Sequence, residues 1–323
     1  MRRWSRTFRS PLRTAKGLWK RRQGLYLKRG TGAGFRYAEV APLPAFGTET
    51  FEEALAVARA IGQGRAGAVE QAGPALRWGL SCLSAPIPEA PRERTVTTAA
   101  LLGSVAECST TALNEALRAG YRVLKLKIGV GVGHEERSLL GALARQLPSG
   151  VQLRLDANAG LAPTEAEAWF QAASGLPVEY LEQPLAPGDE AVMAELSSDA
   201  GVRVALDESV AQLPELSRLA GACPQAVFVV KPGLLGDLPG FLRWREAHRE
   251  VTLVYSSAFE SGLGQMVTRH LAAIDAGRTL AGGLGIEHLF EPDAFGLCPD
   301  GPDLRLKSLE RLAERFWMAA EAA

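Results

Sequence analysis

The sequence has little cysteine, little histidine and no long apolar run. Its four cysteines, Cys82, Cys108, Cys223 and Cys298, are far apart and form no CxxC pair, so we expect neither a secreted disulfide framework nor a structural zinc site. Reduced thiols are typical of cytoplasmic proteins, and we predict that location. No stretch of about 18 apolar residues occurs, which argues against a transmembrane helix and against insertion into a membrane.

The chain also lacks an excess of either charge. Its 36 basic and 36 acidic side chains cancel, which removes any global electrostatic reason to expect a nucleic acid as partner. The 323 residues are 47% hydrophobic. This is enough for one large domain, or for a large domain with a small one.

Acidic residues are missing from the N-terminal segment. The first 29 residues contain eleven arginines and lysines, and the first acid is Glu39. Arginine-rich, acid-poor termini occur in organelle transit peptides, and Arg2-Arg3 is compatible with a twin-arginine signal, but no apolar segment follows. We predict instead a first strand at residues 4–8 and then a basic, mobile loop. That loop, at residues 13–22, could help to hold an anionic small-molecule substrate.

A repeated pattern of short apolar runs, each ending in polar residues, dominates the middle of the chain. The runs are residues 123–127, 151–156, 178–182, 202–207, 227–231 and 251–256, and their polar ends recur every 24 to 29 residues. Nearly continuous apolar runs suit parallel strands that are covered on both faces. Amphipathic segments between and after them predict helices at residues 135–147, 164–173, 238–248 and 265–276.

Two further runs, residues 95–102 and 284–290, bring the predicted strands to eight. Strands that alternate with helices indicate a parallel sheet, and eight of them favour a (β/α)8-type barrel over an open sheet. Catalytic residues of such barrels lie at the carboxyl ends of the strands. In this chain the polar residues occupy those ends.

The first 90 or so residues follow a different pattern, typical of a small α+β domain. We predict antiparallel strands at residues 24–28 and 36–40 and helices at residues 50–62 and 74–84. The predicted domains are therefore a first unit at residues 1–93 and a barrel at residues 94–290. Residues 291–323, which include a helix at 308–322, are expected to complete the first unit.

Three carboxylates, Asp156, Glu182 and Asp207, end successive runs. Carboxylates that converge at one barrel mouth raise one another's pKa unless a cation lies between them. Oxygen ligands suit a hard cation such as Mg²⁺ or Mn²⁺. Each carboxylate alone could equally cap a helix or face solvent, but three at one period favour a metal site.

Lysines end the flanking runs. Lys127 and Lys231 stand at strand ends, and Lys125 shares the face of Lys127 because side chains alternate along a strand. Desolvation or a neighbouring cation lowers the pKa of a lysine and makes it a base near neutral pH. A single lysine would more often be a surface residue, whereas two that flank three carboxylates favour a catalytic role.

Two other patterns point to no site. None of the four histidines ends a predicted strand, so a zinc site or a histidine acid–base pair has little support. The glycine-rich segment 129–133 lacks the GxGxxG order of a dinucleotide site and is interpreted as a flexible loop.

The motifs resemble those of the muconate lactonizing subgroup of the enolase superfamily. Residues 124–127 (LKLK) resemble its KxK motif, residues 156–158 (DAN) its DxN, residues 182–184 (EQP) its E-Q/E-P, residues 207–209 (DES) its DES, and Lys231-Pro232 its second catalytic lysine. Residues 22–26 (RQGLY), 39–50 and 256–264 further resemble segments of the o-succinylbenzoate synthases. The resemblance extends over nearly the whole chain.

The resemblance implies a (β/α)7β TIM-like barrel with an N-terminal α+β capping domain, and a Mg²⁺-dependent hydro-lyase of menaquinone or phylloquinone biosynthesis. It implies Lys127 and Lys231 as catalytic residues and Asp156, Glu182 and Asp207 as ligands of Mg²⁺, for which Mn²⁺ could substitute. Asn158 would support the metal site, and Lys125 would act beside it. Ser256 and Ser257, with their backbone amides, are candidates for binding the succinyl carboxylate of the substrate.

Two alternatives stay open. Dipeptide epimerases and N-acylamino-acid racemases share both lysines and all three carboxylates, but the epimerases usually carry a DxD pair on the last strand, where this chain has residues 285–288 (GIEH). The second alternative is a non-catalytic barrel used as a binding module, against which the intact lysines and carboxylates argue.

Overall fold

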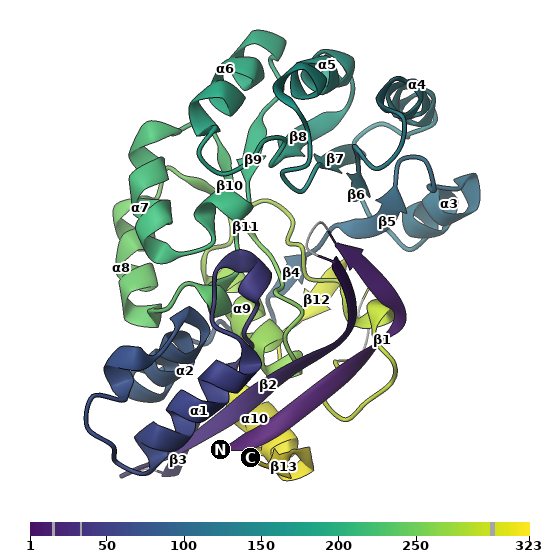
Figure 1. Ribbon diagram of the computed structural model, residues 1–323. Coiled ribbons are helices and arrows are strands. Elements are labelled where there is room, and N and C mark those ends of the chain that lie inside the picture. Colours follow the sequence, from purple (N-terminus) through teal and green to yellow (C-terminus); the bar gives the residue numbers. More distant parts are fainter. Residues whose placement is uncertain (15–16, 33, 298–300) are drawn as a thin grey trace.

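A barrel of parallel strands, covered at one mouth by a smaller α+β unit, forms the protein (Figure 1). The computed structural model describes residues 1–14, 17–32, 34–297 and 301–323, so Cys298 lies outside the described residues. The three cysteines within them are free thiols. None of the helices in these ranges is long and apolar enough to cross a membrane.

Seven strands of the barrel form one parallel sheet in the order β11-β10-β9-β8-β7-β6-β5. They are β5 (Ala100–Ser104), β6 (Val123–Lys127), β7 (Gln152–Asp156), β8 (Val178–Glu182), β9 (Val204–Leu206), β10 (Val227–Val230) and β11 (Thr252–Tyr255). Residues 279–283 take the eighth position through isolated bridges, in which Thr279 pairs with Leu253, Gly283 with Ser256 and Gly282 with Thr98.

The two outermost predicted barrel strands need correction. The segment 284–290 is not a strand: it contains a 3-10 helix, η5 (Glu287–Leu289), and the segment before it closes the barrel. The segment 95–102 is divided between β4 (Thr95–Thr97), which pairs antiparallel with β12 (Asp303–Arg305), and the start of β5. The pairing segments, residues 95–97 and 279–283, are short and contain polar residues or glycine. They lack the apolar run that marks the other strands.

Helices cover the outer face of the barrel sheet, as the alternation predicted (Figure 1). They are α3 (Thr110–Arg118), α4 (Gly133–Ala144), α5 (Pro163–Ala173), α6 (Glu190–Ala200), α7 (Leu213–Ala222), α8 (Leu238–Ala247) and α9 (Gly262–Ile274). Serine side chains cap the first turns of α3 and α9, which satisfies amides that have no partner within the helix. The four predicted helices of this region are confirmed within a few residues.

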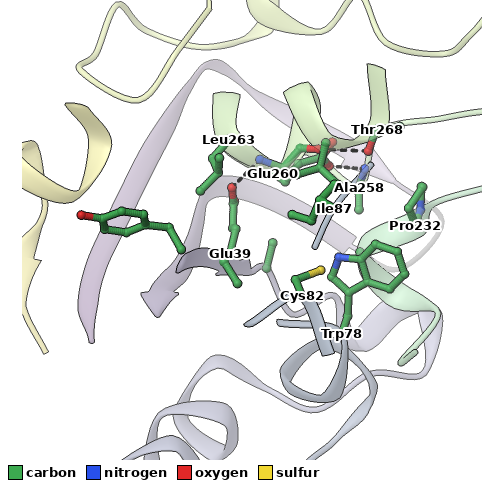
Figure 2. A pocket seen from close by; sticks show the side chains of 15 residues that line it. Glu39, Trp78, Cys82, Ile87, Pro232, Ala258, Glu260, Leu263 and Thr268 are labelled. Atoms are coloured by element: carbon green, nitrogen blue, oxygen red, sulfur yellow. Dashed lines mark hydrogen bonds between the residues drawn. The ribbon is translucent and has the colours of Figure 1, made fainter. Parts of the chain in front are cut away.

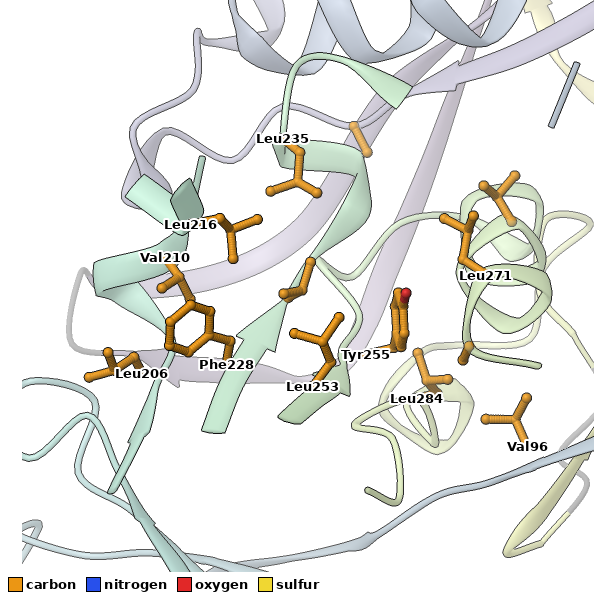
Figure 3. Packing of buried hydrophobic residues seen from close by; sticks show 14 of the residues in the cluster. Val96, Leu206, Val210, Leu216, Phe228, Leu235, Leu253, Tyr255, Leu271 and Leu284 are labelled. Carbon is orange, nitrogen blue, oxygen red and sulfur yellow. The ribbon is translucent and has the colours of Figure 1, made fainter. Parts of the chain in front are cut away.

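Period-2 alternation along the strands separates two apolar layers. Leu206, Phe228 and Leu253 pack outward against the helices, in a cluster that includes Leu216 of α7 (Figure 3). The side chains between them belong to a separate interior cluster made of Tyr180, Ala205, Val227, Val229 and Val254. The same alternation directs the polar residues at the strand ends to the barrel mouth.

The glycine-rich loop after β6 is held by a buried carboxylate. Glu136 of α4 accepts hydrogen bonds from the backbone amides of Gly129 (2.8 Å), Val130 (3.3 Å) and Gly131 (3.1 Å). Three amides converging on one carboxylate form the kind of concavity that binds anions. The chain's own glutamate fills it, so the interpretation as a flexible loop was wrong.

The cap has a sheet in the order β13-β1-β2-β3, against which three helices pack. Its elements are β1 (Arg2–Thr14), β2 (Gly17–Thr31), β3 (Gly34–Val40), η1 (Pro44–Phe46), α1 (Phe51–Gly62), η2 (Val69–Gln71), α2 (Pro74–Ser84), α10 (Leu309–Ala319) and β13 (Glu321–Ala322). A capping box between Thr50 and Glu53 begins α1. Gly24 is required because a Cβ there would lie 2.4 Å from the Val40 carbonyl oxygen and 2.5 Å from the Trp4 ring.

The basic N-terminal segment is a long hairpin instead of a short strand and a loop. β1 pairs antiparallel with β2 as far as Thr14 opposite Gly17. Residues 4–8 alternate between buried and exposed side chains, but residues 9–11 and 20–21 are exposed at consecutive positions, so the sequence gives no alternation to show that the strands continue.

The C-terminal segment returns to the cap, and the two ends of the chain lie close together (Figure 1). β13 pairs with β1 through Arg2 opposite Ala322, and the Arg2 guanidinium lies 5.0 Å from the ring centroid of Trp317 in α10. The division into domains, with the boundary near residue 93 and the share of residues 291–323 in the cap, stays a prediction.

Cap and barrel meet along a buried polar seam. Glu39 of β3 accepts hydrogen bonds from the Ser261 amide (2.8 Å), the Ser261 hydroxyl (2.6 Å) and the Gly264 amide (2.7 Å) at the start of α9. A cavity of about 30 Å³ lies beside it, with Glu39 and Trp78 on the cap side and Glu260 on the barrel side (Figure 2). A carboxylate at a helix N-terminus is stabilised by its free amides, so this contact fixes the cap on the barrel.

Candidate active site

The strand register brings the predicted residues to one mouth of the barrel. Lys127 is opposite Asp156, and Asp156 is opposite Glu182, on three neighbouring strands. Glu182 is opposite Ala205, so Asp207 stands two residues further along on the same face. Lys231 follows the end of β10, four positions from β6 in the sheet order, so the two lysines face each other across the mouth.

A cavity of about 940 Å³ opens at this mouth, between the barrel and the cap. Eight of the nine predicted site residues line it: Lys125, Lys127, Asp156, Asn158, Asp207, Lys231, Ser256 and Ser257. The ninth, Glu182, is 1% exposed and contacts Lys125. The structure therefore gathers all nine in one place.

Ammonium groups lie among the carboxylates. The Lys125 Nζ is 2.8 Å from Asp156 Oδ2 and 2.6 Å from Glu182 Oε1, and the Lys231 Nζ donates to Asp207 Oδ1. The Lys127 Nζ donates to Asn158 Oδ1 at 2.9 Å. Of the three lysines, Lys127 is the one that bonds a neutral side chain. Lys125 pairs with two carboxylates, so it is not an isolated cation beside Lys127.

Burial and mutual repulsion set the electrostatics of the carboxylates. Burial first, and then the charge of Asp156, raise the pKa of Glu182 to about 7. Burial also disfavours ionised Asp156, but Lys125, Lys127 and the Asn158 backbone amide together outweigh it and lower the pKa of Asp156. Although burial opposes it, the same pairing raises the pKa of Lys125 well above its ordinary value. The site concentrates negative charge that needs a cation.

The backbone at the carboxyl ends of β7 and β8 is strained. Asn158, Ala159 and Gln183 have φ values of 46°, 59° and 37°, a region that side chains other than glycine rarely adopt. The Gln183 amide oxygen accepts from the Asp207 amide at 2.9 Å, and its nitrogen donates to the Ser209 hydroxyl at 2.8 Å. Gln183 therefore fixes the backbone that carries Asp207, a role that the sequence did not reveal.

The predicted use of the backbone amides at the end of β11 was wrong. The Ser256 amide donates to the Val230 carbonyl oxygen (2.8 Å) and the Ser257 amide to the Gly283 carbonyl oxygen (3.0 Å), so strand pairing occupies both. The Ser257 hydroxyl also bonds within its own loop, to Glu260. The Ser256 hydroxyl, 3.4 Å from the Gly283 carbonyl oxygen, is the group here with hydrogen-bonding capacity left for a ligand.

Aromatic residues from the cap and the barrel complete the cavity, and the sequence did not assign them a role. Trp19, Phe46 and Phe259 line it, together with His288, and the Phe46 ring centroid lies 4.3 Å from the Lys231 Nζ. Phe46 and Phe259 fall within the motif segments 39–50 and 256–264, which is the signal that could have pointed to them. The contact between Phe46 and Lys231 joins residues that are more than a hundred positions apart, so it cannot be predicted from one segment alone.

In the basic segment 13–22, which was expected to form a mobile loop, residues 15–16 lie outside the described residues, and the described cations Lys20, Arg21 and Arg22 do not line this cavity. Lys20 and Arg21 are exposed on β2 outside the cavity lining, whereas Arg22 is buried. Arginine at position 22 is used inside the protein, so the three cannot act together on a substrate.

The carboxylate group fits a hard divalent cation by its donors. All three carboxylates are at most 5% exposed, and the Glu182 Oε2 is buried without a hydrogen-bond partner among the residues that the structure describes. Within the described ranges no three histidine, cysteine, aspartate or glutamate side chains stand close enough to hold a metal as they are placed, and the lysines lie between them. Oxygen-only donors with one unmatched buried oxygen suit Mg²⁺ once the ammonium groups move aside.

This barrel, with its lysines and carboxylates at the strand ends, defines a class of enzymes. Residues 109–298 match the family described as Enolase C-terminal domain-like, and the chain belongs to the enolase superfamily. The B. subtilis L-Ala-D/L-Glu epimerase has the same fold, with a TM-score of 0.77 at 19% identity over 94% of both chains.

Two further comparisons place the chain more closely. It is 32% identical to the o-succinylbenzoate synthase of Thermosynechococcus vestitus over 81% of this chain and 84% of that protein. It also superposes on the crystal structure of the o-succinylbenzoate synthase of Thermosynechococcus elongatus BP-1, which holds magnesium in the active site, with a TM-score of 0.79 at 28% identity over 98% of both chains. Within the superfamily the chain belongs to the o-succinylbenzoate synthases, and the predicted family, fold class and enzyme activity are confirmed.

Proposed function

We propose that this enzyme removes water from 2-succinyl-6-hydroxy-2,4-cyclohexadiene-1-carboxylate to give 2-succinylbenzoate, in menaquinone or phylloquinone biosynthesis. The observation that carries the proposal is the pair of lysines facing each other across a mouth that contains three buried carboxylates. The cavity of about 940 Å³ is ample for a small anionic acid. The cap, proposed to comprise residues 1–93 and 291–323, would close the cavity over it.

We assign the three carboxylates Asp156, Glu182 and Asp207 to Mg²⁺, with Mn²⁺ as a possible substitute. The relative of known structure holds magnesium in its active site, and the donor set here is suited to the same ion. When bound, the ion would hold the ring carboxylate and neutralise the charge that develops as the adjacent proton leaves. Asn158, whose backbone N–H donates to Asp156 Oδ1 at 2.9 Å, would orient that carboxylate.

Lys127 is proposed to move the proton. As a free amine it would take the proton beside the ring carboxylate, and as an ammonium it would return that proton to the leaving hydroxyl group, so that water departs from the same face. Its Nζ bonds the neutral Asn158 side chain, whereas Lys125 and Lys231 pair directly with carboxylates. Lys231 would remain an ammonium on the opposite face and stabilise the negative charge of the intermediate.

The bonds between Arg6 and Glu287 are evidence against the epimerase alternative. Its guanidinium binds Glu287 at 3.1 and 2.8 Å, and Gln265 donates to the same carboxylate at 2.6 Å. An acidic residue near the last strand position is therefore engaged within the protein and is not free to bind a substrate amine.

The test is a dehydration assay with the diene acid, with and without Mg²⁺, beside a panel of N-acylamino acids and dipeptides. We expect magnesium-dependent formation of 2-succinylbenzoate, its loss in Lys127→Ala, and full activity in Lys20→Ala, which changes an exposed lysine outside the cavity. Turnover of a dipeptide with no dehydration would reject the proposal in favour of the epimerase reaction. No magnesium-dependent turnover of any substrate would favour a binding module.

A further inference from the structure

Arg22 of β2 lies buried where three segments meet. Its Nη1 donates to the Pro42 carbonyl oxygen at 2.7 Å, and its Nη2 donates to the carbonyl oxygens of Ala41 (3.3 Å) and Ala258 (3.1 Å). Two of these carbonyls belong to the cap loop after β3 and one to the barrel loop after β11. One guanidinium thus joins the cap hairpin, a cap loop and a barrel loop.

Each of the two loops carries an aromatic wall of the cavity. The cap loop leads into η1 and Phe46, whose ring is 4.3 Å from the Lys231 Nζ. The barrel loop carries Phe259, which lines the cavity and packs against Trp19 with ring centroids 5.9 Å apart. Leu43 of the cap loop and Ala258 of the barrel loop also belong to one apolar cluster, against which Trp19 and Phe46 pack.

The barrel loop is held in a strained conformation. Phe259 has a φ of 58°, and such residues persist where surrounding bonds over-determine them. Its amide donates to the Ser257 hydroxyl at 2.9 Å, and that hydroxyl donates to Glu260 Oε2 at 2.9 Å. The Ala258 amide donates to the same oxygen at 2.5 Å. Glu260 therefore bonds the N–H of Ala258, and Arg22 bonds its carbonyl oxygen.

Charge supports this arrangement. Burial lowers the pKa of Arg22 to about 10, while the carboxylates of Glu260 and Glu39 favour its charged form. The guanidinium is therefore still protonated at neutral pH and donates to all three carbonyls. A planar fork with several fixed donors can span them, which the single ammonium of a lysine cannot do.

We propose that Arg22 is a positioning residue that sets Phe46 on the cap and Phe259 on the barrel at the spacing that accepts a flat six-membered ring acid. This inference rests on the proposed function and adds the residue that determines how the ring is fitted. Arg22 touches neither the reacting atoms nor the carboxylate group, so its effect is on ring binding and not on the metal.

The test compares Arg22→Lys and Arg22→Met with Arg21→Met, which removes the neighbouring exposed arginine. Binding of 2-succinylbenzoate in the presence of Mg²⁺, binding of Mg²⁺ alone, KM and kcat are measured well below the melting temperature. We expect KM and the product dissociation constant to rise about ten-fold in Arg22→Lys and on the order of a hundred-fold in Arg22→Met. The change in kcat should be smaller, Mg²⁺ affinity should be unchanged, and Arg21→Met should match the wild type.

Hydrogen exchange supplies a readout that needs no substrate. Peptides covering residues 41–47 and 256–261 should exchange faster in Arg22→Lys than in Arg21→Met, while peptides of β6 to β8 should not change. If Arg22→Met does not fold, Arg22→Lys decides. A wild-type KM and unchanged exchange in Arg22→Lys, even with a lower melting temperature, would overturn the proposal. Absence of dehydration in the wild type would instead overturn the proposed function. Hydrogen exchange would still show whether Arg22 positions the two loops.

Discussion

The two sides of the active-site cavity are built by opposite means. On the barrel side, charged groups stand at the ends of strands, and the two-residue alternation of each strand directs them inward. On the cap side, aromatic rings are held by contacts between residues far apart in the chain, such as the bond from Arg22 to Ala258, 236 residues away. The barrel side supplies the chemistry, and the seam with the cap supplies the shape.

The two regions also treat a buried carboxylate differently. Glu182 and Glu39 are both buried, and burial is the largest cause that raises the pKa of each to about 7. At the barrel mouth the remaining charge is repelled by Asp156 and matched by Lys125. At the seam it is met by the hydroxyl and amides at the start of α9. A carboxylate matched by lysine ammonium groups can exchange them for a metal, whereas one matched by backbone amides is fixed.

The largest effect should come from the barrel side. Glu182→Gln removes one charged donor from the carboxylate group, and we expect activity to fall to background because charge stabilisation by the metal is worth several kcal/mol. The fold should persist, since Lys125 keeps its bond to Asp156. Circular dichroism and Mg²⁺ titration check this, with the exposed Glu167→Gln as control. Near-native activity in Glu182→Gln would remove it from the ligand set.

The two lysines should differ from each other. Exchange of the proton beside the ring carboxylate in D₂O, on the diene acid or a slow analogue, should disappear in Lys127→Ala and persist in Lys231→Ala. Loss of a general base typically costs about 10²- to 10⁴-fold in rate. Loss of exchange in the Lys231 variant alone would reverse the two roles. Efficient deuterium incorporation into an N-acylamino acid that needs both lysines would favour the racemase reaction.

The barrel side could be predicted from the sequence because its information is local. A strand run such as residues 123–127 carries its own periodicity, and its polar end shows where the mouth lies. The catalytic spacing follows, since neighbouring parallel strands align Lys127, Asp156 and Glu182. The helices between the runs have similarly local signals, including the serine cap that begins α9.

The cap side could not be predicted in the same way. Strands β1 and β2 form a ribbon in which residues 9–11 and 20–21 are exposed at consecutive positions, and the basic segment was interpreted as a loop. Arg22 looks like its neighbour Arg21 in the sequence, and only the fold buries one and exposes the other. The closure of the barrel by residues 279–283 rests on isolated bridges, which leave no apolar run.

A substitution in the aromatic wall should have a moderate effect that separates shape from chemistry. Phe46→Leu keeps an apolar side chain but removes the ring beside the Lys231 ammonium. We expect KM to rise about three- to thirty-fold, the range of a partly desolvated cation–π contact, with Mg²⁺ affinity unchanged. Steady-state kinetics beside the exposed Phe35→Leu would check this. A loss confined to kcat would place Phe46 in the chemistry instead.

The last effect concerns the seam, leaves turnover aside and appears as a pH dependence of stability. The pKa of Glu39 is raised to about 7 from 4.5 by burial, so between these values the folded protein binds more protons than the unfolded chain. Stability that Glu39 contributes is therefore complete below about pH 4.5 and is lost as the pH rises through 7, by an amount on the order of 3 kcal/mol.

Melting temperatures between pH 5 and 8 should fall with rising pH. Saturating Mg²⁺ should not change the part of this slope that Glu39 causes, because Glu39 is at the seam and not at the barrel mouth. Glu39→Gln should flatten the remaining slope even if it lowers the melting temperature at pH 5 by disturbing the bonds to Ser261 and Gly264. A slope that Mg²⁺ abolishes and Glu39→Gln leaves intact would assign the titration to the carboxylates of the active site and remove the distinction drawn between the two regions.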